Sequence, residues 1–180
     1  MQKFVFIMFL FLSISINSFA ESDEDIRQYE EMINAKQKEA VRNIPKLITQ
    51  YATTLGCNDY FDPKNVVKFK MNDEIVYIGL FSIDTGCSGG TAMSRPVIIT
   101  LRKSISYPEI YVDARSSAPY QTSNELPQNM SRIYVHNNKL WYEAKEFDFK
   151  KDALCCPSIP VRGELRFENG MWKGYPISKK

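Results

Sequence analysis

Two different periods of hydrophobic residues divide this chain near Cys57. Between residues 23 and 55, apolar side chains recur every three or four positions, which is the spacing of one face of an α-helix. Pro45 interrupts this stretch, because a proline inside a helix lacks the amide donor and clashes with the preceding turn. We therefore predict two helices, or one kinked helix, with Asn43 as the cap of the second part and Gly56 at its end. The apolar positions are Ile26, Tyr29, Met32, Ile33, Ile44, Leu47, Ile48, Tyr51 and Leu55.

After Cys57 the hydrophobic period changes to two, which predicts β-strands. The runs at 75–81 and 97–101 are apolar on both faces and are expected to be central strands. Asn-Asp, Asn-Asn and Asn-Gly pairs separate several strands and indicate tight turns. In the last hairpin, a two-residue turn would place Phe167 beside Trp172. The predicted strands cover 67–71, 75–81, 97–101, 110–112, 133–136, 139–142, 161–167 and 171–175.

The order of these elements favours a single α+β domain over residues 21–180. One or two N-terminal helices are expected to pack on one face of an antiparallel sheet of about seven strands, stapled by disulfides. No βαβ alternation is present, and residues 116–131 form a long polar connection.

The first twenty residues have the features of a secretory signal peptide. An early cation precedes an apolar core over residues 4–12, and Ser18 and Ala20 occupy the positions that a signal peptidase requires. The apolar core is shorter than the roughly 20 residues that a bilayer span needs. We expect cleavage between Ala20 and Glu21 and a periplasmic or secreted protein without a membrane span.

Charge and composition narrow the range of partners. The 23 Lys and Arg residues less Lys3 leave 22 basic against 21 acidic residues, and no basic stripe is evident, so we predict no nucleic-acid partner. His136 is the only histidine, and the cysteines lack the spacing of zinc ligands. No metal and no cofactor are therefore predicted.

Four cysteines in an exported chain suggest two disulfides, because disulfides persist in oxidising compartments. Three pairings are possible. One is a bond between the adjacent residues Cys155 and Cys156. We favour the other two, in which each member of that pair is bonded separately to Cys57 or Cys87, so that the "GCSGG" and "CCPS" loops are joined.

The stretch "DTGCSGG" at residues 84–90 shares short motifs with the active sites of two protease classes. Aspartic proteases need two Asp-Thr-Gly carboxylates, and this chain has one, without a convincing second motif behind it. In chymotrypsin-like enzymes Cys87 or Ser88 would need a histidine base that precedes the loop, but His136 follows it, at a predicted hairpin tip. We therefore assign no catalytic residue.

The combination of the "GCSGG" loop, the "CCPS" segment and the closing "RFENGMWKG" hairpin resembles small exported proteins of Gram-negative bacteria that have no assigned activity. The resemblance covers residues 57–175. It implies a periplasmic location, and it implies no substrate and no catalytic residues.

The favoured function is a non-catalytic binding or inhibitor protein that recognises a protein partner in the envelope or extracellular space through its disulfide-stapled loops. Candidate binding residues are Tyr107, Tyr120, Asp84 and Ser88. One alternative is a hydrolase whose acids lie apart in the sequence, and another is an envelope structural or assembly factor. The acids available for a hydrolase are Asp59, Asp62, Asp84, Asp113, Glu143 and Asp152.

Overall fold

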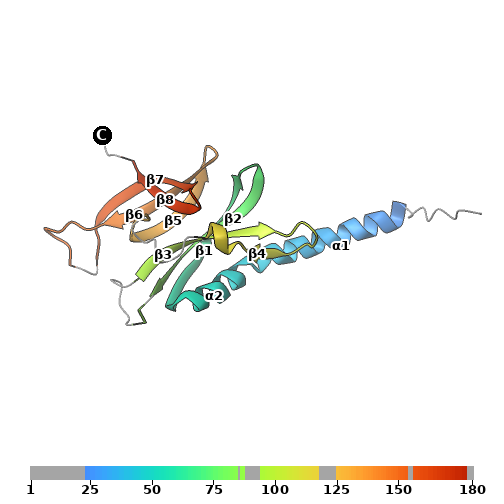
Figure 1. Cartoon of the computed structure of the whole chain (residues 1–180), viewed down its shortest axis with the longest axis horizontal. Coiled ribbons are helices and arrows are strands. Elements are labelled where there is room, and N and C mark those ends of the chain that lie inside the picture. The colour runs from blue at the N-terminus through green and yellow to red at the C-terminus, as the bar shows by residue number, and fades with distance from the viewer. Residues whose placement is uncertain (1–22, 85, 88–93, 118–124, 154–155, 178–180) are drawn as a thin grey trace, which may run out of the picture.

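The fold has three layers, in which one helix and two antiparallel sheets are stacked (Figure 1). The computed structural model describes residues 23–84, 86–87, 94–117, 125–153 and 156–177. Sheet A has the order β1-β2-β3-β4, and sheet B has the order β5-β6-β7-β8. The strands are β1 (Cys57–Met71), β2 (Glu74–Asp84), β3 (Ser94–Lys103), β4 (Ile110–Val112), β5 (Asn129–His136), β6 (Lys139–Glu146), β7 (Ile159–Glu168) and β8 (Met171–Pro176).

Two N-terminal helices, α1 (Asp23–Arg42) and α2 (Ile44–Leu55), meet at Asn43. The predicted interruption is confirmed, because Pro45 cannot donate a hydrogen bond to the preceding turn. Asn43 occupies the predicted N-cap position, but its side chain makes no capping hydrogen bond, and its backbone is helical, with φ −83° and ψ −4°. The amide of Asn43 still donates to the carbonyl of Glu39, and Leu47 donates to Asn43. The two helices therefore form one nearly continuous rod with a bend.

Sheet A is covered on both faces. Ile78 and Ile98 face sheet B, whereas Phe81 and Ile99 pack with Ile48 of α2. Gly79 lets the helix approach closely, since a Cβ there would lie 2.8 Å from the Ile48 side chain. This double burial explains why β2 and β3 are apolar at consecutive positions, and it confirms that they are central strands.

Sheet B contributes one face to the core and presents the other to solvent. Its inner residues pack against sheet A, and Trp172 connects the two layers: its Nε1 donates to the carbonyl of Ser116 at 2.7 Å and to Oγ1 of Thr100 at 3.2 Å. Phe167 and Trp172 face each other as predicted, with ring centroids 5.3 Å apart. The buried inner residues include Ile133, Leu140, Tyr142, Ala144, Leu165 and Trp172.

The predicted turns are confirmed, whereas the predicted single sheet is wrong. Non-glycine residues with positive φ occur at Asn72, Asp73, Asn137, Asn138 and Asn169, within the three expected hairpins. The eight strands form two sheets of four, because β4 and β5 are not paired and the chain crosses from one layer to the other between them. Of the two helices, α2 packs on sheet A, and α1 has no buried residue.

Candidate functional site

The outer face of sheet B carries a row of large polar and aromatic side chains that crosses all four strands. Tyr134 of β5 lies opposite Trp141 of β6, Trp141 lies opposite Glu164 of β7, and Glu164 lies opposite Tyr175 of β8. Residues directly opposite each other in antiparallel strands share one face of the sheet. Since Leu140 and Leu165 point into the core, this row points away from it.

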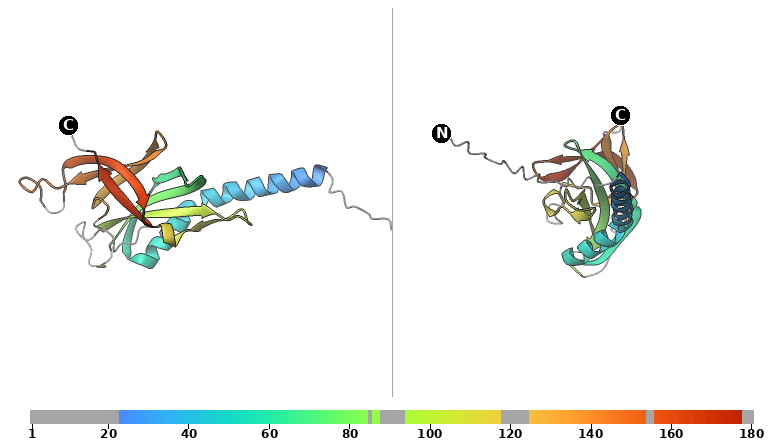
Figure 2. Two further views of the ribbon diagram at one scale, coloured as in Figure 1. Left: turned by 45° about the horizontal axis from the view of Figure 1, so that its top comes forward. Right: turned by 90° about the vertical axis from the view of Figure 1, so that its right-hand side faces the viewer.

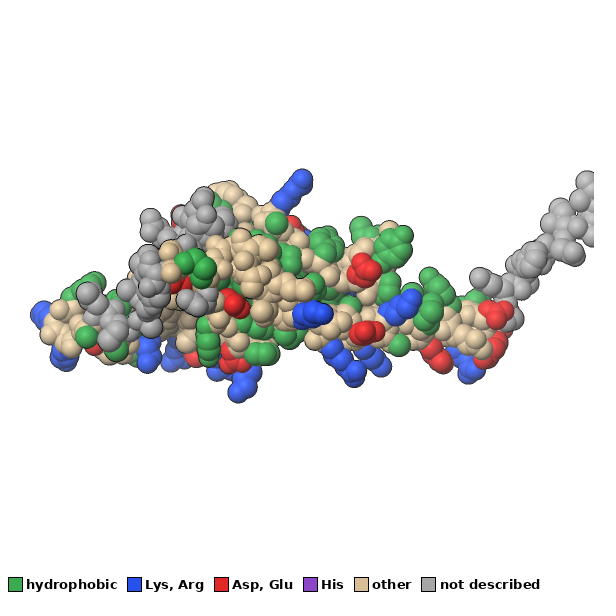
Figure 3. Space-filling model, turned by 90° about the horizontal axis from the view of Figure 1, so that it is seen from below, with side chains coloured by type: hydrophobic (Ala, Val, Ile, Leu, Met, Phe, Trp, Pro, Cys, Tyr) green, Lys and Arg blue, Asp and Glu red, His purple; other side chains and the backbone are tan. Residues whose placement is uncertain are grey.

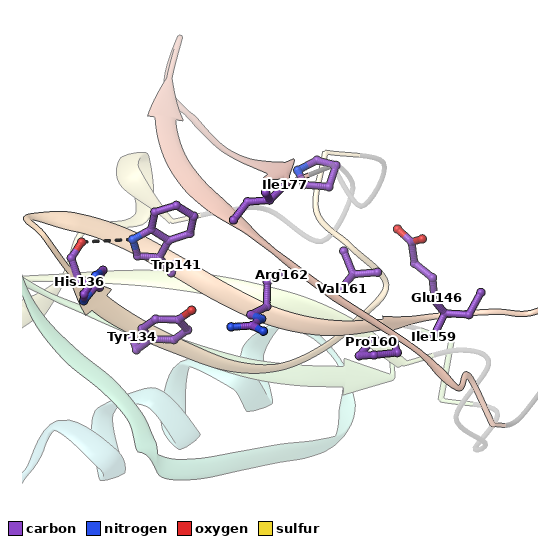
Figure 4. Close-up of a pocket in the computed structure, with 10 residues that line it drawn as sticks. Tyr134, His136, Trp141, Glu146, Ile159, Pro160, Val161, Arg162 and Ile177 are labelled. Carbon is purple, nitrogen blue, oxygen red and sulfur yellow. Dashed lines mark hydrogen bonds between the residues drawn. The ribbon is translucent and has the colours of Figure 1, made fainter. Parts of the chain in front are cut away.

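A pocket of about 740 Å³ lies beside this row, and all four strands contribute to it. Tyr134, Trp141 and Arg162 line it from the outer face, whereas Val161 also packs partly against the core. Figure 4 shows Arg162 at its centre, with Tyr134, Trp141 and His136 on one side and the start of β7 on the other. The wall near β7 is mainly aliphatic, and Ile177 closes the pocket from above. The lining residues are Tyr134, His136, Trp141, Glu146, Ile159, Pro160, Val161, Arg162, Pro176 and Ile177.

Local contacts fix the two aromatic rings of the pocket. The indole Nε1 of Trp141 donates a hydrogen bond of 3.1 Å to the carbonyl oxygen of His136, so the ring is held against the hairpin that joins β5 and β6. The guanidinium of Arg132 lies 5.5 Å from the centre of the Tyr134 ring, within the range of a cation–π interaction. Both rings are half-buried and therefore offer preformed contact area to a ligand.

The cations of this face differ in how far they are neutralised. Glu164 accepts hydrogen bonds from Arg166 at 2.8 Å and from Lys139 at 3.2 Å, and these bonds lower the pKa of its carboxyl group. Arg166 also lies over the ring of Tyr175, 4.7 Å from its centre. In contrast, the exposed guanidinium of Arg162 makes no hydrogen bond or ion pair within the part of the chain that the structure describes. Arg162 is therefore a cation that the pocket can offer to an anion, with Glu143 as its neighbour directly opposite on β6.

The predicted binding residues do not form one site. Asp84 is buried at 4% exposure at the end of β2, where its carboxylate accepts a hydrogen bond from the amide of Gly86 at 3.0 Å. Tyr107 is 68% exposed in the loop between β3 and β4. Because β3 begins opposite Asp84 and ends just before this loop, the two residues lie at opposite ends of that strand. Tyr120 and Ser88 are outside the described residues.

The disulfide pairing that we favoured is wrong. Cys57 bonds directly to Cys87, with 5.1 Å between their Cα atoms. The register explains this, since Cys57 lies opposite Asp84 and the following turn brings Cys87 back beside β1. Cys156 is also disulfide-bonded, and Cys155, the remaining cysteine, is outside the described residues. Cys87 is therefore not a thiol nucleophile in this state.

Several acids that a hydrolase would use instead stabilise turns. Asp62 accepts a hydrogen bond from the amide of Lys64, and Asp152 accepts bonds from the amides of Asp148 and Ser158. Asp113 pairs with Arg102 at 2.6 Å. Burial raises the pKa of Asp113, but the hydrogen bonds from Arg102 and Ser116 outweigh it, so the pKa lies below its usual value. Within the described ranges, no three His, Cys, Asp or Glu side chains are grouped as metal ligands.

The sequence interpretation missed Tyr134, Trp141 and Arg162 as a site. The sequence did contain an indication of this site, because buried and outward positions alternate along a strand. Tyr134 follows the buried Ile133, and Trp141 lies between two buried residues of β6. A large aromatic residue at an outward position marks a surface that is apolar without being part of the core. The missing information was that β5, β6 and β7 are neighbours in one separate sheet.

Comparison with protein-family models, curated proteins and solved structures found no match for this chain. Among the residues that the structure describes, no helix is both long enough and apolar enough to cross a bilayer.

Proposed function

We propose that this protein is an exported, non-catalytic binding protein that recognises a partner protein through the outer face of sheet B. The observation that carries the proposal is the pocket of about 740 Å³ in which Arg162 is unpaired within the described chain, beside Tyr134 and Trp141 (Figure 4). Ligand pockets commonly have volumes of about 300–1,000 Å³. The sequence placed the contact surface on the disulfide-stapled loops, and the geometry favours sheet B instead.

The chemistry of the pocket favours an extended peptide segment that carries a carboxylate next to apolar side chains. An arginine fork binds a carboxylate through two parallel hydrogen bonds, and Arg162 is placed to do so. Ile159, Val161 and Ile177 form an aliphatic wall beside it. Tyrosine and tryptophan contribute most often to the energy of protein interfaces, because their rings bury large areas at a low entropic cost.

Two further observations support an exported protein without catalysis. The Cys57–Cys87 disulfide is a bond that persists in oxidising compartments, which agrees with the expected signal peptide. His136, at the edge of the pocket, has no carboxylate partner among the described residues. A histidine that acts as a general base is usually oriented by a third group.

A peptide selection tests this proposal directly. The oxidised protein is screened against a displayed library of random dodecapeptides, with a Trp141→Ala/Arg162→Gln variant in parallel. We expect peptides with an Asp, a Glu or a free carboxyl terminus beside apolar residues to be enriched on the wild type and lost on the variant. Arg166→Gln is the matched control, because it removes a cation from the same strand outside the pocket. Equal enrichment on all three proteins, or none, would show that the face does not bind peptides.

The location of binding is read by fluorine NMR. The chain has two tryptophans, Trp141 in the pocket and Trp172 in the core, so 5-fluorotryptophan labelling gives one reporter and one internal reference. A selected peptide should shift the Trp141 signal and leave the Trp172 signal unchanged. A shift of Trp172 alone would contradict the assignment of the site.

A further inference from the structure

Over its first three turns, helix α1 has an apolar stripe that nothing in the described structure covers. The helix has 20 residues and no buried side chain, and it extends away from the sheets (Figures 1 and 2). Ile26, Tyr29 and Met32 are 44%, 62% and 43% exposed. Helices in water obtain most of their stability from packing of their apolar face, and this face is unpacked over the first three turns.

The body of the protein covers the same stripe only near its end. Gln37 and Ala40 line a small hollow with the loop that follows β3, and Ile44 is fully buried against sheet A. Ile33 is half-buried, so the cover ends near this residue. The exposed part of the stripe thus continues a packed surface and ends at the far tip of the helix.

The charges of α1 are divided along its length. Residues 23–33 contain five acids and one base, which gives −4, whereas residues 34–42 contain three bases and one acid, which gives +2. Figure 3 shows the same division, with acidic side chains at the far tip and basic side chains closer to the body. A helix with this pattern is complementary to a copy of itself that runs in the opposite direction.

We propose that α1 pairs in an antiparallel manner with α1 of a second copy of this chain. A two-fold axis between Tyr29 and Glu30 places Ile26 opposite Ile33 of the second copy and Tyr29 opposite Glu30, so that the two Tyr29 side chains are neighbours across the axis. Residues 23–36 then overlap over about 21 Å at 1.5 Å per residue. Lys36 comes to lie against the acidic first turn of the second copy, at residues 23–25.

The loop between β3 and β4 adds to the same surface. Ile105 is 104% exposed and Tyr107 is 68% exposed, and Tyr107 lies in the hollow beside Gln37 and Ala40. In the antiparallel pair, the first turn of the second copy ends just before this hollow. Lys103 and Glu109 also line it, so the loop contributes one charge of each sign next to the seam.

The test compares charge changes on opposite faces of α1. Ile26→Glu/Ile33→Glu places charges in the seam, and Gln28→Glu/Ala35→Glu places added charge on the opposite face of the helix. In sedimentation experiments on the full chain, as processed by the expressing cell, we expect a dimer for the wild type. The seam variant should weaken it at least about a hundredfold, because apolar contacts are replaced by buried like charges. The opposite-face variant should remain dimeric.

A charge exchange separates pairing from simple loss of helix. Lys36→Glu should weaken the dimer about threefold to tenfold, and Lys36→Glu/Asp25→Lys should restore it, since the attraction is re-formed with the signs reversed. An equimolar mixture of Ile26→Cys and Ile33→Cys proteins should give a heterodimeric disulfide, which parallel helices would not form. A monomeric wild type, an equal effect of both charge pairs, or the absence of rescue would overturn the proposal.

Discussion

Sheets A and B have the same topology and different surroundings. Each is a four-stranded antiparallel meander, with strand order β1-β2-β3-β4 in one and β5-β6-β7-β8 in the other. Sheet A lies between α2 and sheet B, and its two central strands are buried on both faces. Within the described residues, sheet B packs on sheet A through its inner face, and the outward residues of β6 and β7 are exposed or only half-buried.

Because of this difference in burial, the residues that stabilise the fold and the residues that can bind a ligand lie in different parts of the molecule. A side chain in sheet A has core neighbours on either face, and a change there alters the packing of α2 or of sheet B. On the outer face of sheet B, Tyr134, Trp141 and Arg162 can be replaced without opening a cavity. Sheet B can therefore keep its fold through its inner residues while its outer residues serve a ligand.

The two tryptophans give the strongest test of this separation. Trp172→Ala should cost about 3–5 kcal/mol, because it removes a fully buried indole and leaves the Thr100 hydroxyl as the remaining side-chain donor to the carbonyl of Ser116. Trp141→Ala should cost less than about 1 kcal/mol and should abolish peptide binding. Urea unfolding and peptide titration of both variants measure these effects. Similar losses of stability in the two variants would contradict the one-sided burial of sheet B.

The Cys57–Cys87 disulfide joins the start of β1 to the turn that follows β2, and its removal tests how much this bond stabilises sheet A. The bond joins residues 30 positions apart, and closing a loop of this length should stabilise the fold by about 3.5 kcal/mol in the chain-entropy model. Cys57→Ser/Cys87→Ser should therefore melt at a markedly lower temperature and be exported in lower yield. Calorimetry of the variant and the wild type gives the comparison, and an unchanged melting temperature would remove the stabilising role of this bond.

Each sheet has a glycine that packs against large side chains, Gly79 in sheet A and Gly163 in sheet B. Replacing each with alanine should lower the stability of the fold by different amounts. A Cβ at Gly163 would lie 2.3 Å from the carbonyl oxygen of Tyr175 and 2.5 Å from the ring of Tyr142. Gly163→Ala should cost about 1–3 kcal/mol, because a backbone atom of the neighbouring strand must move. Gly79→Ala meets only the side chains of Ile48 and Ile99 and should cost less. The reverse order in chemical denaturation would mean that α2 adapts less readily than β8.

The smallest expected effect on stability is that of replacing Asp113. This residue directly follows β4, and its amide donates to the carbonyl of Thr100 in β3. Its pKa is lowered below the reference value of 3.8, so the folded state binds fewer protons than the unfolded state. The resulting stabilisation is complete above about pH 4 and is lost as the pH falls through the lowered pKa. Asp113→Asn should thus be less stable than the wild type at pH 7, and the difference should shrink at pH 3. A difference that is independent of pH would assign the effect to packing.

The hairpins and helices of this fold follow from local patterns. The Asn72-Asp73, Asn137-Asn138 and Asn169-Gly170 pairs favour left-handed backbone, and all three occupy turns. The division into two sheets does not follow from them, because alternation specifies a strand without specifying its neighbour. The long connection after β4 allows either a fifth neighbour in the same sheet or a new layer, and burial of both faces of β2 and β3 requires the second.

The candidate site was less predictable than the fold for a related reason. Each aromatic residue of the pocket could be identified as outward-facing from its own strand, but the pocket exists only where Tyr134, Trp141 and Arg162 meet across three strands. The disulfide pairing failed in the same way. Cys87 bonds to the first strand of its own sheet, and a sequence without known register does not show that Cys57 lies opposite Asp84, three residues before Cys87.

Backbone hydrogen bonds continue through Asn43, so α1 is a rigid extension of α2. Helix α2 is buried against sheet A through Ile44 and Ile48, and α1 extends from it over about 30 Å. A change of 10° at the joint would displace the far tip by about 5 Å over that length. Pro45, which sets the bend, therefore controls where a partner held at Ile26 would stand relative to the outer face of sheet B.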